Sequence, residues 1–380
     1  MTVQPEVLSE ILLKHATERP GKAFAIFPGG ETWTYGAVPE IIDPVMRGLA
    51  ALGVGEGESV FTWLPNGPDF LRVWFAVNCL GAIHAPCNLS WRGAMLEHAV
   101  RISGARVAVI HADLLPRLAE VARHKLEHII VVGGAARALP GVRVVRGDDI
   151  FHSRQAPVAM AAAGPWTVMQ HMFTSGTTGP SKAVASSYRQ AALFLEPPYP
   201  DALGEKACFL LVLPLFHAGG KASVYAVARE GGTLVIPRSF RTEDFWPLVR
   251  EFGVTSTTVV EQMAAFLMAQ EPAGTDRDNG LDYINIAPMR DLAYGFAERF
   301  DVTLWSSYGS TEVGAPVSAM ADPTRPGLTG YVREGYEIRI VDEHDMPLPA
   351  GTAGQLVVRA DLPWAMMSEY SRDAEATASA

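Results

Sequence analysis

The chain has 380 residues, of which 48% are hydrophobic and 19% are charged, so it can bury a substantial core and is not of disordered composition. At roughly 150 residues per domain, this length predicts two or three domains or one large domain with several lobes. The net charge of −10 argues against binding of nucleic acid through its phosphates.

Apolar strands alternate with amphipathic helices in the first part of the chain. Strands are expected at 59–64, 82–86, 106–111 and 128–132, and helices at 37–51, 69–80, 93–103 and 115–125. This alternation is typical of βα units built around a parallel sheet. It stops in a stretch rich in Ala, Pro and Gly, residues 147–164, and we place the end of a first αβ lobe, residues 1–164, there.

The same alternation resumes in residues 165–316, which we interpret as a second αβ lobe. Its strands are expected at 167–173, 207–213, 233–236, 256–260, 283–286 and 303–306, and its helices at 188–195, 222–230, 242–252, 262–270 and 290–300. After Pro316 the helical pattern ends, and residues 337–341 and 355–359 read as two strands of a small antiparallel β module, residues 317–380. The predicted fold is therefore α/β, with two stacked lobes, largely parallel sheets and a small β module.

A loop rich in Thr, Ser and Gly follows the strand that ends at Phe173. Its candidate phosphate-binding residues are Thr174, Ser175, Gly176, Thr177, Thr178, Gly179 and Lys182. Glycines let backbone N–H groups converge on an anion, hydroxyls add donors, and lysine adds charge. Lys182 precedes Ala183, so the spacing of a Walker A loop is not met, and neither is that of a Gly-x-Ser-x-Gly nucleophile elbow. A solvated turn is the remaining alternative.

Two further motifs also follow predicted strand ends, where ligands of α/β folds collect. They are Leu-Pro-Leu-Phe-His-Ala-Gly-Gly at 213–220 and Ser-Tyr-Gly-Ser-Thr-Glu at 307–312. Together with the 174–182 loop they resemble the adenylate-forming superfamily of acyl-CoA synthetases, luciferases and peptide-synthetase adenylation domains. Weaker matches at 32–35, 80–88 and 287–289 occur in the expected order. The overall sequence is most similar to the crotonobetaine/carnitine–CoA ligase branch.

The resemblance implies roles for single residues. The 174–182 loop would hold the β- and γ-phosphates of ATP, and Thr311 would contact the α-phosphate. The residues implied at the adenine are Tyr308, stacked on the ring, with Ala287 and Pro288 on the opposite wall. Glu312 would bind Mg²⁺, and His217 would lie between the acyl pocket and the thiol tunnel. Lys182, His217, Thr311 and Glu312 are thus the catalytic candidates. Tyr308 as an ordinary aromatic, Glu312 as a surface acid and His217 as a core histidine remain alternatives.

The activity implied by the resemblance is activation of a carboxylic acid by ATP and transfer of the acyl group to CoA. Residues expected at the acid pocket are Phe216, His217, Glu261, Gln262, Met263, Trp305 and Ser306. The polar pair Glu261-Gln262 would suit a small, polar or cationic acid. Which acid and which thiol are used stays open, as does homodimer formation, and a non-catalytic relative that binds acyl groups or nucleotide is the alternative function.

Several features depart from the family pattern. Ala183 follows the loop lysine where glycine is common, and Ile286 would narrow the space near the adenine or the acid. Lys221 is either a contact of a carboxylate or phosphate, or a solvated residue at a helix start. The histidines other than His217 show no metal-ligand spacing and are expected at the surface. The family's mobile C-terminal domain cannot be located before Ala380, so we expect this chain to bind substrates but to turn over poorly.

Cysteine usage and the N-terminal sequence bear on localisation. The three cysteines form no CxxC pair and cannot all pair with one another, which favours a reducing compartment. The first residues have neither the basic nor the apolar region of a secretory signal, and no uninterrupted apolar stretch of about 20 residues is present. We expect a cytoplasmic protein without an integral membrane segment.

Overall fold

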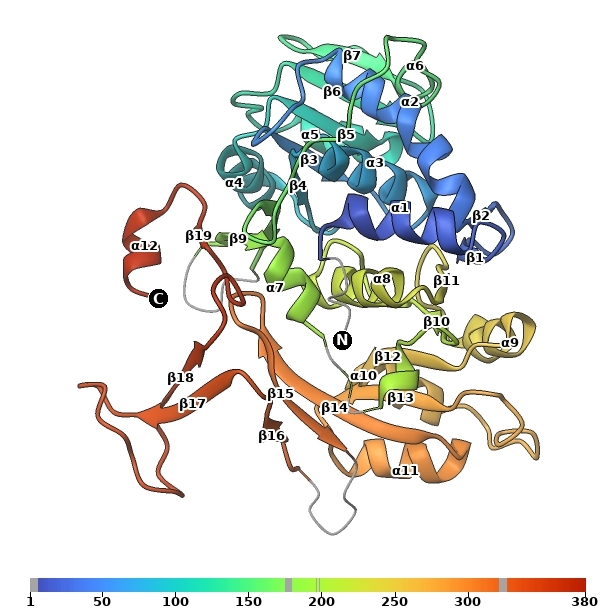
Figure 1. The fold of residues 1–380 in the computed structure, drawn as a ribbon, viewed down its shortest axis with the longest axis vertical. Coiled ribbons are helices and arrows are strands. Elements are labelled where there is room, and N and C mark those ends of the chain that lie inside the picture. Colours follow the sequence, from blue (N-terminus) through green and yellow to red (C-terminus); the bar gives the residue numbers. More distant parts are fainter. Residues whose placement is uncertain (1–5, 175–179, 196, 198, 321–326) are drawn as a thin grey trace.

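The computed structural model describes residues 6–174, 180–195, 197, 199–320 and 327–380. Two large sheets and a separate two-stranded antiparallel sheet organise this part of the chain (Figure 1). Parallel pairs dominate both large sheets, so the predicted α/β fold class is confirmed. In the described residues, no helix is both long enough and apolar enough to cross a bilayer.

The first sheet has eight strands in the order β19-β9-β8-β4-β3-β5-β6-β7. Their bounds are β3 Ser59–Trp63, β4 Ile83–Pro86, β5 Val107–His111, β6 His128–Val132, β7 Arg143–Arg146, β8 Val168–Phe173, β9 Ala183–Ser187 and β19 Glu369–Tyr370. Strands β3 to β7 are parallel to their neighbours, whereas β8, β9 and β19 pair antiparallel with one another. The helices in this half are α2 Val38–Ala50, α3 Pro68–Cys79, α4 Gly93–Ser103, α5 Leu115–Ala119, α6 Gly147–Phe151 and α7 Tyr188–Leu193.

The second sheet has nine strands in the order β16-β15-β14-β13-β12-β10-β11-β1-β2. Their bounds are β1 Ala23–Ile26, β2 Thr32–Thr34, β10 Cys208–Leu210, β11 Thr233–Val235, β12 Ser256–Val260, β13 Tyr283–Ala287, β14 Thr303–Ser310, β15 Gly314–Met320 and β16 Tyr331–Val332. The helices associated with it are α1 Leu8–Glu18, α8 Ala218–Glu230, α9 Thr242–Phe252, α10 Glu261–Met268 and α11 Asp291–Phe300.

Both sheets draw strands from either side of residue 164. Strand β1 pairs in parallel with β11 of the second sheet, and β8 and β9 join the first sheet beside β4. The phenol of Tyr35 also donates a 2.7 Å hydrogen bond to the Gly232 carbonyl, which ties the N-terminal segment to the second sheet. The predicted boundary between two lobes at residue 164 stays a prediction, because each large sheet contains strands from both sides of this residue.

Helices α1, α3 and α8 lie between the two sheets (Figure 1). One continuous apolar core contains residues of α3 and of α8, among them Trp74, Phe75, Val224 and Tyr225. Burying side chains of this size stabilises a structure by about 1.5–3 kcal/mol each. The seam between the two sheets is therefore a packed core, and the residues at its rim are held in fixed relative positions.

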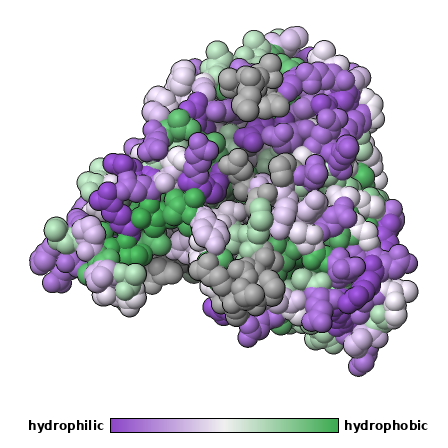
Figure 2. All heavy atoms as spheres, turned by 60° about the horizontal axis from the view of Figure 1, so that its bottom comes forward, coloured by the Kyte–Doolittle hydropathy of each residue, from purple (hydrophilic) through white to green (hydrophobic). Residues whose placement is uncertain are grey.

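The C-terminal segment is divided among three sheets. Strands β17, Tyr336–Val341, and β18, Gln355–Ala360, form the two-stranded antiparallel sheet, which confirms the predicted hairpin. Strands β15 and β16 instead extend the second sheet, and β19, followed by α12, Ala374–Ala378, extends the first. Figure 2 shows apolar side chains gathered toward the side on which the hairpin projects, and Tyr331, Val332, Ile340 and Leu356 are exposed apolar residues of these strands.

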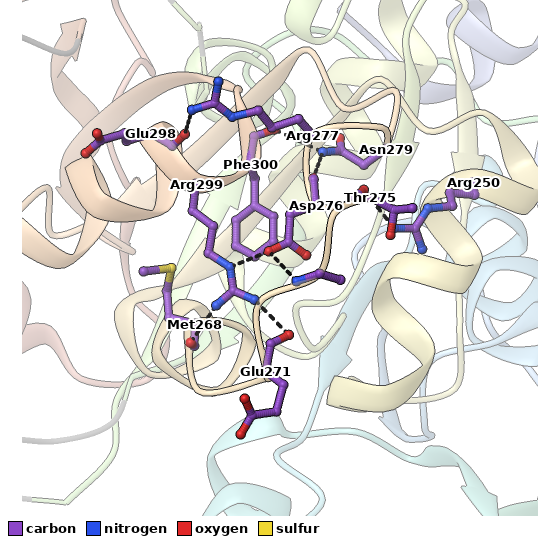
Figure 3. Close-up of polar contacts among 11 residues, drawn as sticks. Arg250, Met268, Glu271, Thr275, Asp276, Arg277, Asn279, Glu298, Arg299 and Phe300 are labelled. Atoms are coloured by element: carbon purple, nitrogen blue, oxygen red, sulfur yellow. Dashed lines mark hydrogen bonds and ion pairs between the residues drawn. The ribbon is translucent and has the colours of Figure 1, made fainter.

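The connection between α10 and β13 is fixed by a cluster of charged side chains (Figure 3). Arg299 Nε lies 2.7 Å from Asp276 Oδ2, and Arg299 also donates to the Met268 and Glu271 carbonyls. Asn279 donates to the Asp276 and Phe300 carbonyls at 2.7 and 3.0 Å. These side chains donate to backbone carbonyls within and beside the loop that leads into β13, and thereby hold the start of β13 in place.

Candidate active site

A cavity of about 1150 Å³ lies where the carboxyl ends of β12, β13 and β14 face the β8–β9 hairpin and the first turn of α8. Its walls thus come from both large sheets, and β19 of the first sheet contributes Tyr370. Ligands of open α/β sheets bind outside the carboxyl ends of the strands, and a cavity of this size suits a cofactor-sized ligand. The three sequence motifs meet here.

The two ends of the Thr/Ser/Gly loop, at Thr174 and Lys182, are hydrogen-bonded to each other and extend the β8–β9 pairing. The Thr174 N–H donates to the Lys182 carbonyl at 3.0 Å, and the Lys182 N–H donates to Thr174 Oγ1 at 3.2 Å. Ser181 Oγ donates to the Thr174 carbonyl at 2.6 Å. Thr174, Ser181 and Lys182 all line the cavity. The predicted residues Ser175, Gly176, Thr177, Thr178 and Gly179 lie outside the described residues.

Lys182 and Glu312 are linked by Tyr370, which sequence reasoning did not select. The Lys182 Nζ lies 4.4 Å from the centroid of the Tyr370 ring, and the phenol donates a 3.0 Å hydrogen bond to Glu312 Oε1. Burial, and then the neighbouring carboxylate of Glu312, raises the pKa of Tyr370 to about 12, so the phenol keeps its proton at neutral pH. An aromatic ring, an ammonium and a carboxylate therefore form one wall of the cavity.

Thr311 and Glu312 lie in the turn between β14 and β15 and both line the cavity. The fully buried Gln190 holds this turn, because its Nε2 donates to the Thr311 and Glu312 carbonyls at 3.0 and 2.9 Å. Gly309 is required beside them, since a Cβ there would collide with the Gly314 carbonyl oxygen. Glu312 therefore lines the cavity on a turn whose backbone is held by hydrogen bonds from Gln190.

The donor set at Glu312 fits Mg²⁺ held jointly with a nucleotide. Mg²⁺ usually takes one or two carboxylates, several waters and substrate phosphates, and does not need an all-protein cage. Glu312 supplies one carboxylate, which Tyr370 connects to the loop flank that carries Lys182. Among the described residues, no group of three or more His, Cys, Asp or Glu side chains could hold a metal ion. A magnesium ion here would therefore take the Glu312 carboxylate as its protein ligand and complete its coordination with phosphate oxygens and water.

His217 occupies the N-cap of α8 and lines the cavity together with Phe216. Its Nδ1 accepts a hydrogen bond from the Gly219 N–H at 3.3 Å, and burial lowers its pKa. Asn66 fixes the preceding loop, because it donates to the Leu213 carbonyl at 3.0 Å and accepts from the Leu215 N–H at 2.9 Å. His217 is thus a neutral side chain at the cavity wall and not a residue of the closed core.

The predicted adenine wall is only partly on the cavity. Ala287, at the end of β13, lines it and is joined to Pro288 by a cis peptide bond. Pro288 is exposed, and the Tyr308 side chain is 45% exposed, and neither residue is among those that line the cavity. The stacking role of Tyr308 remains a prediction that depends on how a nucleotide sits at this open side.

Of the residues predicted at the acid pocket, Phe216, His217 and Met263 line the cavity. Glu261 instead faces Arg290, with 3.4 Å between the carboxylate and the guanidinium, and Gln262 is exposed on α10. Trp305 and Ser306 are buried within β14, short of the carboxyl end where Ser307 reaches the cavity. Position along the strand, which the sequence motif does not set, decides which of these residues meet a ligand.

The structure corrects the expectation for Ile286. That side chain is fully buried in the core with Ala264 and Leu267, so it does not narrow the cavity. Its neighbour Asn285 lines the cavity instead, and the Asn285 Nδ2 is buried without a hydrogen-bond partner. Side chains alternate along a strand, and the register places Asn285 rather than Ile286 on the open side.

Both readings of Lys221 are also wrong. The residue is 2% exposed and faces away from the cavity, with its Nζ 2.9 Å from His84 Nδ1 and 4.0 Å from the centroid of the Trp74 ring. Burial lowers the pKa of Lys221 well below its ordinary value. The expectation that the other nine histidines lie at the surface fails for the four that are buried, His15, His84, His111 and His171. His124, His152 and His344 are exposed, as expected.

Comparison with known proteins identifies relatives along most of the chain. The sequence profile of the family described as AMP-binding enzyme matches residues 12–371. The crotonobetaine/carnitine–CoA ligase of Salmonella heidelberg (strain SL476) is 29% identical over 366 residues, which cover 92% of this chain and 69% of that relative.

Solved structures share the same fold. The anthranilate CoA ligase AuaEII in complex with anthranoyl-AMP superposes with a TM-score of 0.88 at 21% identity, over 100% of this chain and 74% of that one. The inhibitor-bound N-terminal domain of FACL13 from Mycobacterium tuberculosis gives 0.83 at 21% identity, over 100% and 94%. At about 21% sequence identity, these two structures show that the chain shares their fold.

Proposed function

The chain belongs to the AMP-binding enzyme family, and from this premise we propose that it is an acid–CoA ligase that activates a small carboxylic acid with ATP. Family membership confirms the resemblance to adenylate-forming enzymes that the three motifs carry. The observation that supports the proposed reaction most strongly is the convergence of Lys182, Thr311 and Glu312 on one cavity that also contains His217.

The proposed reaction has two steps. A carboxylate oxygen of the acid attacks the α-phosphorus of ATP, the bond to the bridging oxygen breaks, and pyrophosphate leaves to give an acyl-adenylate. A thiol, which we take to be that of CoA, then loses its proton to solvent and attacks the acyl carbon through sulfur, and AMP leaves with the electron pair of the broken C–O bond. Stabilisation of charge on the phosphates is the main demand of the first step.

The chain's own groups meet that demand from two sides. The ammonium of Lys182 and the hydroxyl of Thr311 would contact phosphate oxygens, and Glu312 would hold Mg²⁺, which neutralises polyphosphate charge when bound. His217, neutral and on the cavity wall, would orient the acid carboxylate or the incoming thiol. Tyr370 contacts both Lys182 and Glu312 on the cavity wall.

We propose that the acid is small and carries a neutral polar group. Thr258 and Asn285 are register partners on β12 and β13, and both line the cavity. Thr258 Oγ1 and Asn285 Nδ2 are buried without partners in the described structure, so a bound ligand that bonds to them would remove a cost of about 1–3 kcal/mol per group. The sequence suggested a small, polar or cationic acid, and the carboxylate of Glu261, which faces Arg290 instead of the cavity, weakens the case for a cationic one.

The test is acid-dependent exchange of labelled pyrophosphate into ATP by the 380-residue chain, with a panel of neutral polar, cationic and long-chain acids. We expect ATP binding measurable by calorimetry and, since the chain is expected to turn over poorly, only slow exchange with one of the neutral polar acids. Lys182→Ala should weaken ATP binding about 10- to 100-fold, because bonds to charged groups contribute about 1.5–3 kcal/mol.

The exposed Lys125 provides the matched control, since Lys125→Ala removes a lysine away from the cavity. ATP binding that is unaffected by Lys182→Ala would contradict the proposed phosphate grip. ATP binding without exchange for any acid would support the alternative, a nucleotide-binding relative without turnover. Thioester formation after addition of CoA would then separate CoA from other thiols as the acceptor.

A further inference from the structure

Helix α4 packs against β9 (Figure 1). Its residues His98 and Arg101 form a chain of hydrogen bonds that ends on the loop flank. Arg101 Nη2 lies 2.8 Å from His98 Nδ1, and His98 Nε2 lies 2.7 Å from the Ser181 carbonyl oxygen. A guanidinium can only donate, so His98 Nδ1 accepts and Nε2 carries the proton that it donates to Ser181. Both partners of His98 thus select the same tautomer.

Ser181, which His98 contacts, lies in one flank of the loop and is hydrogen-bonded to the other flank at Thr174. Its hydroxyl donates to the Thr174 carbonyl at 2.6 Å, and the N–H of the next residue, Lys182, donates to Thr174 Oγ1. The peptide that His98 holds is therefore the one that carries the Lys182 side chain. His98, Arg101, Ser181 and Lys182 all line the cavity.

We propose that His98 and Arg101 are positioning residues for nucleotide binding: they fix the Ser181–Lys182 peptide so that the Lys182 ammonium points into the phosphate end of the cavity. This inference rests on the proposed function, since it assigns the pair to the same ATP site. The pair acts through Ser181, and the sequence motifs do not include it.

The packing of α4 does not depend on this pair. The helix is anchored by the buried side chains of Leu96, Ala99 and Val100 in the core of the first sheet. His98 is half-buried and Arg101 is exposed at the cavity rim. Replacing either residue should therefore leave the fold intact and change the orientation of the loop flank.

The experiment compares ATP affinity and pyrophosphate-exchange kinetics of the 380-residue chain with those of His98→Leu, His98→Gln and Arg101→Met. We expect His98→Leu to weaken ATP binding and raise the KM for ATP about tenfold, the effect of one lost bond to an oriented group. The KM for the acid should stay within about twofold. His98→Gln, which keeps an N–H for Ser181, should recover most of the affinity.

Arg101→Met should weaken ATP binding less than His98→Leu, and the double variant should be no worse than His98→Leu alone, because the two residues act in series. Glu97→Gln is the matched control, since Glu97 is the neighbouring residue of α4 but accepts from the Ala122 N–H and does not line the cavity. It should bind ATP as the unmodified chain does.

The outcomes separate this inference from the proposed function. If Lys182→Ala loses ATP affinity while His98→Leu and His98→Gln bind like the unmodified chain, the positioning role is refuted and the function stands. If His98→Leu and His98→Gln lose equal affinity, or if the KM values for ATP and acid rise together, the pair has a general structural role and the inference fails. If the unmodified chain binds no ATP, the proposed function fails and the inference fails with it.

Discussion

Lys221 provides a test of how the seam between the two sheets is built. Its amine is buried between α8 and the first sheet, where the groups that face it are His84, which in turn lies 2.9 Å from Thr62 Oγ1, and the Trp74 ring. Burial lowers the pKa of Lys221 well below 10.5, and burial and then the nearby Lys221 amine lower the pKa of His84 well below 6.5. We predict that replacing the lysine changes the pH dependence of stability.

The sign follows from proton binding. Between the lowered pKa of folded Lys221 and 10.5, the unfolded chain holds a proton on this amine that the folded chain does not, so the free energy of unfolding rises with pH. The slope is about 1.4 kcal/mol per pH unit for one such group. His84 is neutral in both states above about pH 7.5, so it contributes to the slope only near pH 7.

Lys221→Met keeps the aliphatic volume but removes the titrating amine. The free energy of unfolding of Lys221→Met relative to that of the unmodified chain should fall as the pH rises from 7 to 9, by about 1.4 kcal/mol for each pH unit above the lowered pKa of folded Lys221. The loss of the hydrogen bond to His84 costs about 1–3 kcal/mol at both pH values and does not affect this difference.

The difference in the free energy of unfolding is measured by urea unfolding, followed by tryptophan fluorescence, at pH 7, 8 and 9. The substitution Lys125→Met, at an exposed lysine, is the control. Parallel curves for the unmodified chain and Lys221→Met would mean that the buried amine keeps its proton, held by the Trp74 ring, and would refute the reasoning.

Two further substitutions test the cavity walls. Tyr370→Phe keeps the ring beside Lys182 but removes the hydrogen bond to Glu312. The affinity for ATP measured by calorimetry should therefore fall about three- to tenfold in the presence of Mg²⁺ and stay unchanged in its absence. An equal loss of affinity with and without Mg²⁺ would contradict this prediction. Gly220→Ala would place a Cβ against the Pro214 carbonyl oxygen at the start of α8, so the free energy of unfolding should fall by about 1–3 kcal/mol in denaturant unfolding; a stability equal to that of the unmodified chain would show that this loop can shift freely.

The order of strands and helices could be predicted in most of the chain because apolar alternation is a local property. The assignment of strands to sheets could not. Strands β1 and β2 have four and three residues, and β1 finds its parallel partner β11 about two hundred positions later in the chain. Pairing over such a separation depends on tertiary packing, which leaves no periodic signal in so short a segment.

The residues of the site divide in the same way. Lys182, Thr311 and His217 could be predicted, because each belongs to a motif that follows a strand end. Tyr370 and His98 could not, because each is brought to the cavity by an element whose own sequence shows no ligand-binding pattern. The period-two pattern of β13 shows that Asn285 and Ile286 face opposite sides, but not which side is open.

The exchange of strands between the sheets has a consequence for function. The loop flanks with Lys182 belong to the first sheet, whereas Glu312, Asn285 and the other end of the cavity belong to the second. A nucleotide that contacts Lys182 and Glu312 together would bridge the two sheets, so their relative position is part of the geometry of the reaction. The packed seam around α3 and α8 sets that position, and Lys221, buried within it beside His84, lies one residue after the glycine pair that follows His217. Substitutions in this seam should therefore change ATP affinity through the distance between the two walls, even where they touch no residue of the cavity.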